Sequence, residues 1–254
     1  MRKTERHRRI LALLDREGFV STDALAGELE SAPITIRRDL AELDAAGHLS
    51  RVHGGAEQRE GHHRFIGGSF ERNLATNIEM KRRIAKAAAT LCADGDSIVL
   101  DGGTTTYSML PYLRGRHLSV LTNSLHIVEA FAADSDTRLL LAGGEVFSKQ
   151  NVVLSPHDDF GVGAFKAAAF FMSAEAVVAD GLKQSDSLLV QGERRMLDLA
   201  ERTIVLADAS KFERDAPIRV CGLDRVDALV CEGQPPKAVR DRLRHAELVL
   251  IHPH

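Results

Sequence analysis

Short polar segments directly follow several apolar runs in the second half of the sequence, and their residue types can bind phosphate and sugar hydroxyl groups. The first segment, DGGTTT, covers residues 101–106. Its glycines let the backbone approach a ligand closely, and threonines at the start of a helix offer hydroxyl groups beside free N–H groups. Asp101 can accept hydrogen bonds from sugar hydroxyls. The segment is a candidate phosphate cradle, although a capped tight turn without a ligand would use the same residues.

Later segments repeat this chemistry: TNS at residues 122–124, DG at 180–181 and ADASKF at 207–212. Any one of them is ordinary in a turn. Together, their neutral donors, their one or two carboxylates and Lys211 suit a small phosphorylated polyol or sugar.

Short apolar runs alternate with helical segments around these residues. The runs show little alternation of polar and apolar side chains, which is typical of strands that helices cover on both faces. The predicted strands are residues 97–100, 118–121, 138–141, 167–172, 203–206, 228–230 and 248–251, and the predicted helices are 104–113, 124–133, 187–200 and 235–244. This order predicts an α/β fold with a mostly parallel sheet. Because ligands of such sheets bind outside the carboxyl ends of the strands, the polar segments would meet at one edge.

Residues 31–43, SAPITIRRDLAEL, form a second candidate site. At 100° per residue, a helix here places Ile36, Leu40 and Leu43 on one apolar face. Arginine can pair with guanine or grip phosphate, and isoleucine can meet a thymine methyl group. The segment therefore predicts a DNA-recognition helix, although a solvated helix with ordinary surface arginines has the same pattern. The outward side chains are Ile34, Thr35, Arg37 and Arg38.

The flanking segments have the order of a winged helix-turn-helix. A helical stripe over residues 10–14 comes first, and Ser21 can cap a second short helix. After the recognition helix, HLSRVHGGAE at residues 48–57 predicts a β-hairpin wing. Arg51 and His53 of this wing would contact the DNA backbone or the minor groove.

The motifs ERHRRILALL, VSTDALAGEL, TIRRDL and LSRVHGGA resemble the DNA-binding domain of the deoxyribose-operon repressor (DeoR) family of bacterial transcription regulators. SFERN, DGDSIVLDGGTTT, LTNS, LAGG, ADGL and LADASKF resemble the family's effector domain, which shares the fold of sugar-phosphate isomerases and coenzyme A transferases. The resemblance implies a repressor, not an enzyme, of a carbohydrate or polyol catabolic operon, controlled by a phosphorylated sugar or polyol. It implies an effector pocket made of Asp101, Gly103, Thr104, Thr105, Thr106, Thr122, Asn123, Asp180 and Lys211.

Several positions depart from the family's pattern. Ala32 stands where the family usually has a serine that can cap the recognition helix, so we expect Ser31 to take that role or the cap to be weaker by ~1 kcal/mol. Residues 173–176, SAEA, replace a Gly-Ala-Asp-Gly-like sequence. Glu193 replaces a frequent lysine, and residues 188–189 replace a pair that is often acidic. The resemblance therefore does not identify the sugar.

The sequence predicts a winged helix-turn-helix domain over residues 1–57, a linker over 58–76 and a phosphosugar-sensing effector domain over 77–254. Two alternatives remain open. A constitutive DNA binder with a degenerate effector domain would show no ligand-dependent melting. A sugar-phosphate isomerase-like enzyme would turn over a substrate, and its candidate proton-transfer groups are Asp101, Glu175, Asp180 and Lys211.

The bulk composition limits the partners. The formal net charge is −3, but the basic residues gather near the N-terminus and the recognition helix, and charges act on DNA only within ~8 Å at physiological salt. No run approaches the ~20 apolar residues of a membrane span, so we expect a cytoplasmic protein without a membrane partner. Three scattered cysteines predict neither disulfides nor a zinc site, and we expect no metal or cofactor. Because double-stranded operators usually mirror protein symmetry, we expect a homo-oligomer, either a dimer or a tetramer.

Overall fold

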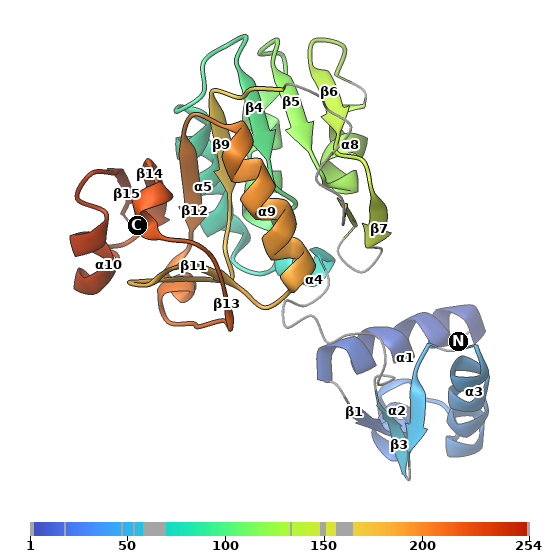
Figure 1. Ribbon diagram of the computed structural model, residues 1–254. Coiled ribbons are helices and arrows are strands. Elements are labelled where there is room, and N and C mark those ends of the chain that lie inside the picture. The colour runs from blue at the N-terminus through green and yellow to red at the C-terminus, as the bar shows by residue number, and fades with distance from the viewer. Residues whose placement is uncertain are drawn as a thin grey trace. The chain divides into compact units, whose positions relative to one another are not determined.

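The computed structural model describes residues 3–17, 19–46, 48–52, 54–57, 70–132, 134–147, 151–155 and 165–252. The chain forms two compact units, Met1–Arg64 and Phe65–His254 (Figure 1). Of the predicted site residues, His53 lies outside the described part of the chain.

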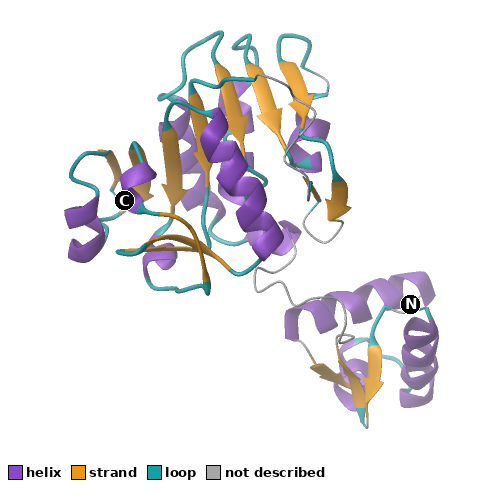
Figure 2. Cartoon of the chain, viewed as in Figure 1, coloured by secondary structure: helices purple, strands orange, loops and turns teal. Residues whose placement is uncertain are grey.

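The first unit combines helices with a three-stranded antiparallel sheet of order β1-β3-β2 (Figure 2). Its core includes Ile10, Leu25, Ile36 and Leu40, each at most 1% exposed. The predicted helix-turn-helix with a β-hairpin wing is therefore confirmed. The elements are α1 (Lys3–Glu17), β1 (Phe19–Ser21), α2 (Thr22–Glu28), α3 (Pro33–Ala45), β2 (Ser50–Val52) and β3 (Gly55–Glu57).

The two glycines of the wing have different steric roles. Gly54 has a φ of +87° in the turn between β2 and β3, a conformation that favours glycine. Gly55 pairs with Ser21 of β1, and a Cβ atom at Gly55 would overlap the carbonyl oxygen of Val20. The first glycine therefore permits the turn, and the second permits the close approach of β3 to β1.

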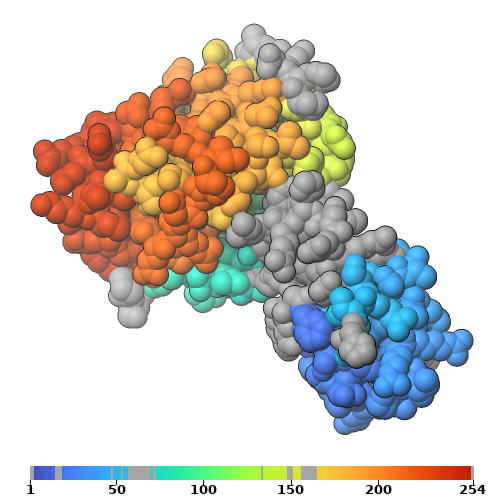
Figure 3. All heavy atoms as spheres, turned by 60° about the horizontal axis from the view of Figure 1, so that its bottom comes forward, coloured from blue at the N-terminus to red at the C-terminus, as the bar shows by residue number. Residues whose placement is uncertain are grey.

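The second unit is built on a parallel sheet of order β15-β14-β12-β9-β4-β5-β6, which confirms the predicted α/β fold. Its C-terminal residues, coloured red, gather at one side of this unit (Figure 3). The strands are β4 (Ser97–Leu100), β5 (Ser119–Thr122), β6 (Arg138–Leu141), β9 (Ala169–Met172), β12 (Thr203–Ala207), β14 (Ala228–Glu232) and β15 (Glu247–Ile251). The helices are α4 (Phe70–Ala75), α5 (Ile78–Ala89), α6 (Thr104–Tyr107), α7 (Leu110–Leu113), α8 (Leu125–Phe131), α9 (Ser187–Leu199) and α10 (Lys237–Arg242).

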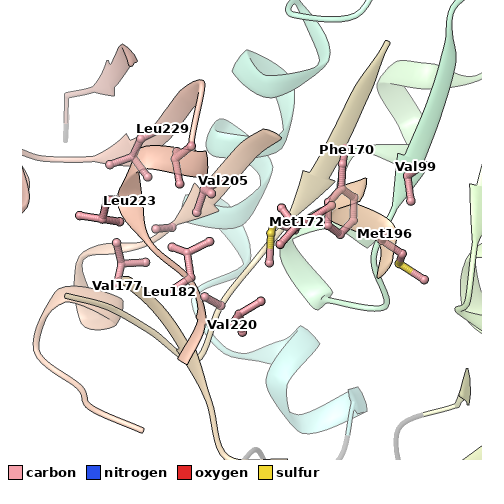
Figure 4. Packing of buried hydrophobic residues seen from close by; sticks show 14 of the residues in the cluster. Val99, Phe170, Met172, Val177, Leu182, Met196, Val205, Val220, Leu223 and Leu229 are labelled. Carbon is pink, nitrogen blue, oxygen red and sulfur yellow. The ribbon is translucent and has the colours of Figure 1, made fainter. Parts of the chain in front are cut away.

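Helices cover both faces of this sheet and divide its apolar residues between two cores. In Figure 1, α9 lies in front of the sheet and crosses one of its faces, while α5 lies behind the sheet, on its other face. Val99 of β4 belongs to the core on the α9 face, with Met196 (Figure 4). Its neighbours Ile98 and Leu100 belong to the core on the α5 face, with Ile84. Because both faces are buried, the strands read as continuous apolar runs in the sequence.

The structure adds elements that the sequence analysis did not predict. A separate antiparallel sheet and a hairpin have strands of only three or four residues, so their alternation of side chains is too short to stand out. The helix α4 falls within residues 58–76, which were predicted as a linker; residues 58–69 lie outside the described part. The added strands are β7 (Glu145–Phe147), β8 (Val152–Leu154), β10 (Ala176–Val178), β11 (Gly181–Gln184) and β13 (Ile218–Cys221).

The single helix predicted over residues 104–113 is two short helices, α6 and α7. Between them Met109 N donates to Thr106 O at 2.9 Å, in a tighter turn than an α-helix has. Pro111 has no N–H group and cannot donate to the carbonyl oxygen of Tyr107, so a continuous helix would lose that bond. The break limits the helix that follows the first polar segment to a single turn.

Candidate functional site

The carboxyl ends of β4 and β9 form a topological switch point of the sheet. From β4 the chain runs outward through β5 and β6, and it then returns to β9 on the other side of β4. Connections that leave in opposite directions open a crevice, which is where ligands of open parallel sheets bind. A cavity of about 410 Å³ opens here, lined by Asp101 after β4 and Ser173 after β9.

Asp101 fastens the first polar segment to the end of β9. Its Oδ1 accepts hydrogen bonds from Gly103 N at 2.8 Å and Thr106 Oγ1 at 2.5 Å. Its Oδ2 accepts from Ser173 N at 2.7 Å. Burial raises the pKa of the Asp101 carboxyl, and these hydrogen bonds offset part of the rise. Because a carboxylate has about four acceptor positions and three are used here, Asp101 shapes the cavity wall and has little capacity left for sugar hydroxyls.

Gly103 is required by the same packing. A Cβ atom at Gly103 would overlap Ser173 Oγ, and it would lie 3.0 Å from Asp101 Oδ1 and 3.2 Å from Thr106 Oγ1. The missing side chain therefore lets the loop after β4 close against the end of β9.

The structure brings most of the predicted effector residues to this cavity. Thr106 and Thr122 are fully buried and are not part of its lining. Thr106 Oγ1 donates to Asp101, and Thr122 Oγ1 accepts from Ser124 N at 3.1 Å, so both threonines hold the strand ends in place. The predicted residues on the lining are Asp101, Gly103, Thr104, Thr105, Asn123 and Lys211.

The structure separates Asp180 from this cavity. Asp180 occupies the turn between β10 and β11, where its exposed carboxylate lies 3.2 Å from Arg219 and 3.9 Å from Lys183. It borders a second hollow, of about 350 Å³, together with Arg242 and His245. The sequence analysis placed it in the pocket because ADGL follows an apolar run, but that run is β10 of the separate antiparallel sheet.

Among the described residues that line the cavity, the basic ones are Lys81, Lys211 and Arg214. Burial lowers the pKa of both lysines, and the nearby carboxylate of Asp208 opposes this change. Lys81 is 6% exposed, and its Nζ donates to the carbonyl oxygen of Asn73. A buried ammonium group whose bonds to water are lost gains from an incoming anion, so this part of the cavity favours a phosphate.

The sequence analysis did not identify Lys81. Lys81 lies in the buried stripe of α5 with Ile84, Ala85 and Ala88. A lysine inside such a stripe is unusual, and this was the signal that could have identified it. Arg83 of the same helix pairs with the buried Glu232.

The helix α4 supplies one wall of the cavity through Phe70 and Asn73. Phe70 stacks on His126, with ring centroids 4.0 Å apart, and meets Tyr107 edge-on at 5.4 Å. In sequence, α4 is the first described element after the first unit. The wall is therefore made by the part of this unit that is nearest in sequence to the candidate DNA reader.

Glu193 of α9 is a buried acid on the cavity lining, 8% exposed. Its Oε1 accepts from Gln184 Nε2 at 2.7 Å, whereas Oε2 has no hydrogen-bond partner within the described structure. Burial raises the pKa of this carboxyl well above its usual value, and the charges of Asp101, Asp186 and Glu175 raise it further. The surroundings therefore favour the neutral acid.

The helix α3 presents the predicted DNA-reading side chains to solvent. Ile34 is 70% exposed, and the side chain of Arg38 is 84% exposed. Arg37 and, on β2 of the wing, Arg51 are also exposed, while Thr35 is half-buried. The predicted direction of this helix face is confirmed, and its exposed isoleucine is apolar surface that a partner can cover.

Asp39 fixes α3 to α1 from the buried side. Its carboxylate accepts hydrogen bonds from the Arg6 guanidinium, with Nη2 to Oδ1 at 3.0 Å, and lies 3.0 Å from His7 Nε2. Burial alone would raise the pKa of Asp39, but the hydrogen bonds from Arg6 and His7 hold it below its usual value. This ion pair fixes the orientation of the recognition helix on the rest of the unit.

The start of α3 differs from the expectation that Ser31 takes over its cap. The N-cap residue is Ala32, which makes no side-chain hydrogen bond to the helix. Ser31 Oγ instead donates to the carbonyl oxygen of Leu29 at 3.0 Å. Pro33 opens the helix and has no N–H group that needs a cap.

A membrane helix, a metal site and a reactive cysteine find no support within the described part of the chain. No helix there has the length and the apolar character that crossing a membrane requires. No three histidine, cysteine or acidic side chains gather there as a metal site would need. Burial raises the pKa of Cys92 and Cys221 to about 11 and that of Cys231 to about 12, which disfavours their reactive thiolate form.

Comparisons with known proteins match both units. A DeoR-like helix-turn-helix domain model matches residues 6–60, and a DeoR C terminal sensor domain model matches residues 76–233. The glycerol-3-phosphate regulon repressor of Escherichia coli (strain K12) is 29% identical over 254 residues, which cover 98% of this chain and 100% of that protein. The transcriptional regulator UlaR of Shigella dysenteriae serotype 1 is 29% identical over 230 residues, 91% of each chain. A solved ribose 5-phosphate isomerase A from Methanocaldococcus jannaschii is similar with a TM-score of 0.40 and 19% identity, over 54% of this chain and 55% of that one.

Proposed function

The chain belongs to the DeoR family of transcription regulators, and we propose that it represses a carbohydrate or polyol catabolic operon under the control of a phosphorylated ligand. The observation that carries the proposal is the cavity at the switch point of the sheet, which the buried Lys81, the half-buried Lys211 and a glycine–threonine loop line together, in the same chain as an exposed recognition helix. The relatives support it, since their names assign them to the glycerol-3-phosphate regulon and to transcriptional regulation.

The DNA-binding part of the proposal rests on α3 and the wing. Ile34, Thr35, Arg37 and Arg38 would read the major groove, and Arg51 of the wing would contact the backbone or the minor groove. Operators with twofold symmetry would be bound by a homo-oligomer. Sedimentation equilibrium of the full chain at the concentrations used for DNA binding measures its mass.

The ligand part of the proposal rests on the charges of the cavity. Lys81, Lys211 and Arg214 would bind the phosphate, together with the hydroxyl groups of Thr104 and Thr105. A cavity of about 410 Å³ has the size of a site for a small molecule. The ligand class is therefore a phosphorylated sugar or polyol.

We propose that α4 couples the ligand to the DNA-binding unit. A ligand shifts DNA affinity only if it favours one arrangement of the chain over another. α4 contacts the cavity through Phe70 and Asn73, and it adjoins in sequence the segment that leads to the recognition helix. A change in α4 on ligand binding would therefore occur in the described element of the second unit that is nearest in sequence to the first unit.

Replacing Lys211 by methionine is expected to weaken the binding of a phosphorylated ligand about 10- to 100-fold, because a hydrogen bond to a charged group is lost. The measurement is thermal melting with glycerol 3-phosphate, ribose 5-phosphate, fructose 6-phosphate and glucose 6-phosphate. A ligand at 100 times its Kd adds about 2.7 kcal/mol to the stability of the wild-type protein. Lys237→Met, at an exposed lysine of α10, is the control. A shift equal in wild type and Lys211→Met would place the site elsewhere, and no shift with any compound would favour a constitutive DNA binder.

Replacing Phe70 by alanine is expected to uncouple the two functions. The variant removes the stack on His126 but leaves the basic residues of the cavity in place, so the ligand should still bind. The effect of the ligand on DNA affinity, typically 5- to 150-fold for coupled sites, should disappear. Fluorescence anisotropy on a duplex selected from random sequences measures this with and without ligand. The control is Leu74→Ala, which alters α4 at a residue that does not line the cavity. If Phe70→Ala keeps the full effect of the ligand, α4 is not the coupling element.

A further inference from the structure

Two buried polar atoms on the cavity lining make no hydrogen bond within the described structure, Asn123 Oδ1 and Glu193 Oε2, and the proposed phosphate site uses neither. Glu193 Oε2 is buried, lines the cavity and makes no hydrogen bond within the described structure, while Oε1 is held by Gln184. A buried polar atom without a partner is costly, so it is most stable when a ligand completes its hydrogen bonds.

The charged groups around Glu193 are acidic. Asp101 lies at the end of β4, Glu175 follows β9 and Asp186 precedes α9, and each disfavours a negative charge on Glu193. Basic side chains on two strands that contact α9 are paired with other acids: Lys183 of β11 lies 2.9 Å from Asp215, and Arg219 of β13 lies 3.2 Å from Asp180.

The side chains next to Glu193 on its own helix are also directed away from it. Arg194 donates to the carbonyl oxygen of Val220 at 3.0 Å, and Arg195 donates to that of Ser155 at 2.6 Å. The acid that acts most strongly on both cavity lysines is Asp208, and Glu175 and Asp101 act more weakly on Lys211. The cavity therefore has a basic part that suits phosphate and an acidic part around Glu193.

We propose that Glu193 determines the specificity of the cavity: as an un-ionised carboxylic acid, its Oε2–H group donates a hydrogen bond to a hydroxyl or carbonyl oxygen of the ligand, away from the phosphate. Oε1 accepts from Gln184, which leaves the proton on Oε2. This inference rests on the proposed function, since it needs a phosphorylated ligand in the cavity. It adds that the ligand carries an oxygen acceptor at its other end and that no ammonium group lies there.

Two substitutions distinguish the effect of the hydrogen-bond donor at position 193 from the effect of the size of the side chain. Glu193→Gln keeps a donor, because the amide N–H can replace the acid O–H, and it cannot ionise. Glu193→Leu keeps a similar volume without a donor. We expect Glu193→Gln to bind the sugar and polyol phosphates used above about as tightly as the wild type at pH 6, and Glu193→Leu to bind them about tenfold more weakly. Inorganic phosphate carries no sugar or polyol oxygen for Glu193 to bind, so it should bind equally to all three.

The pH dependence gives the second readout. Above the pKa of Glu193 the donor is lost, so the Kd of the wild type should rise relative to that of Glu193→Gln by up to tenfold per pH unit. Changes in the charge of the lysines and of the phosphate itself affect both proteins and cancel in this ratio. Calorimetric titration from pH 6 to pH 9 measures it, with Glu201→Gln, an exposed acid just beyond α9, as the control.

If Glu193→Leu binds the phosphorylated ligand as tightly as the wild type while Lys211→Met binds it more weakly, this inference is overturned and the proposed function is not. Affinity that rises with pH in the wild type relative to Glu193→Gln would also overturn it, because it would show an ionised Glu193 that binds an ammonium group. Failure of every phosphorylated compound to bind would contradict the proposed function, and this inference would fall with it.

Discussion

Replacing Arg37 and Arg38 together by alanine is expected to abolish specific operator binding and to leave ligand binding unchanged. Each arginine that pairs with a base edge contributes about 1–3 kcal/mol to discrimination, so the double variant should bind a selected duplex at least ~30-fold more weakly. Both side chains are exposed, and the acid nearest to Arg38, Glu42, lies 3.7 Å away, so the fold does not depend on them. The loss should therefore reflect DNA contacts and not unfolding.

Fluorescence anisotropy at one fixed salt concentration measures this effect on the selected duplex and on a scrambled duplex, because affinity for DNA depends steeply on salt. Arg244→Ala, in the second unit and with 79% of its side chain exposed, is the matched control for loss of a positive charge. Thermal melting of each variant confirms the fold. Specific affinity that survives in the double variant would remove α3 from its proposed role.

Replacing Asp39 by alanine is expected to destabilise the first unit by about 3–5 kcal/mol, because Arg6 and His7 both lose the buried carboxylate that pairs with them. Only 12% of the Arg6 side chain is exposed, so water cannot readily replace the lost acceptor. Small domains are stable by about 5–15 kcal/mol in total, so the variant should populate unfolded forms of this unit. Hydrogen–deuterium exchange of α1 and α3 in the full chain measures the loss. Asp23→Ala, at an exposed position of α2, is the control, and unchanged exchange in Asp39→Ala would contradict the proposed role of the ion pair.

The same ion pair predicts an acid limit for the first unit. The folded pKa of Asp39 lies below its usual value, which is about 3.9 in an unfolded chain. A depressed folded pKa contributes stability that is complete above the unfolded pKa and is lost as the pH falls through the folded one. Exchange in α1 and α3 should therefore accelerate below about pH 4, and it should do so less in Asp39→Asn, which is already destabilised at neutral pH.

The sequence predicts those elements in which burial repeats over enough residues to leave a clear pattern of apolar side chains. The strands of the parallel sheet were identifiable because both faces are covered, which makes runs such as residues 204–207 wholly apolar. The recognition helix was identifiable because one stripe is apolar and the rest is not. The short strands β10, β11 and β13 were not, since three or four residues carry too little periodicity and β13 pairs with a strand that lies far from it in sequence.

Candidate site residues were predictable where they directly follow a strand of the sheet. They were less predictable where only tertiary packing brings them to the cavity. The loop at residues 101–105 and Lys211 reach the cavity because parallel strands end at one edge of the sheet. Asp180 was misplaced because nothing local distinguishes the end of β10 from the end of a strand in the main sheet. Lys81 and Phe70 were missed because each lies on a helix before the sheet begins, and only the folded chain brings those helices to the cavity.

The recognition helix is anchored by Asp39 on one side and exposes its reading face on the other. Substitutions at the four outward positions, Ile34, Thr35, Arg37 and Arg38, leave the anchor and the apolar core in place. Operator preference can therefore diverge between paralogues without a compensating change in stability. The same separation allows the outward residues of another regulator to be transplanted onto this helix, which would redirect an unchanged ligand sensor to a different promoter.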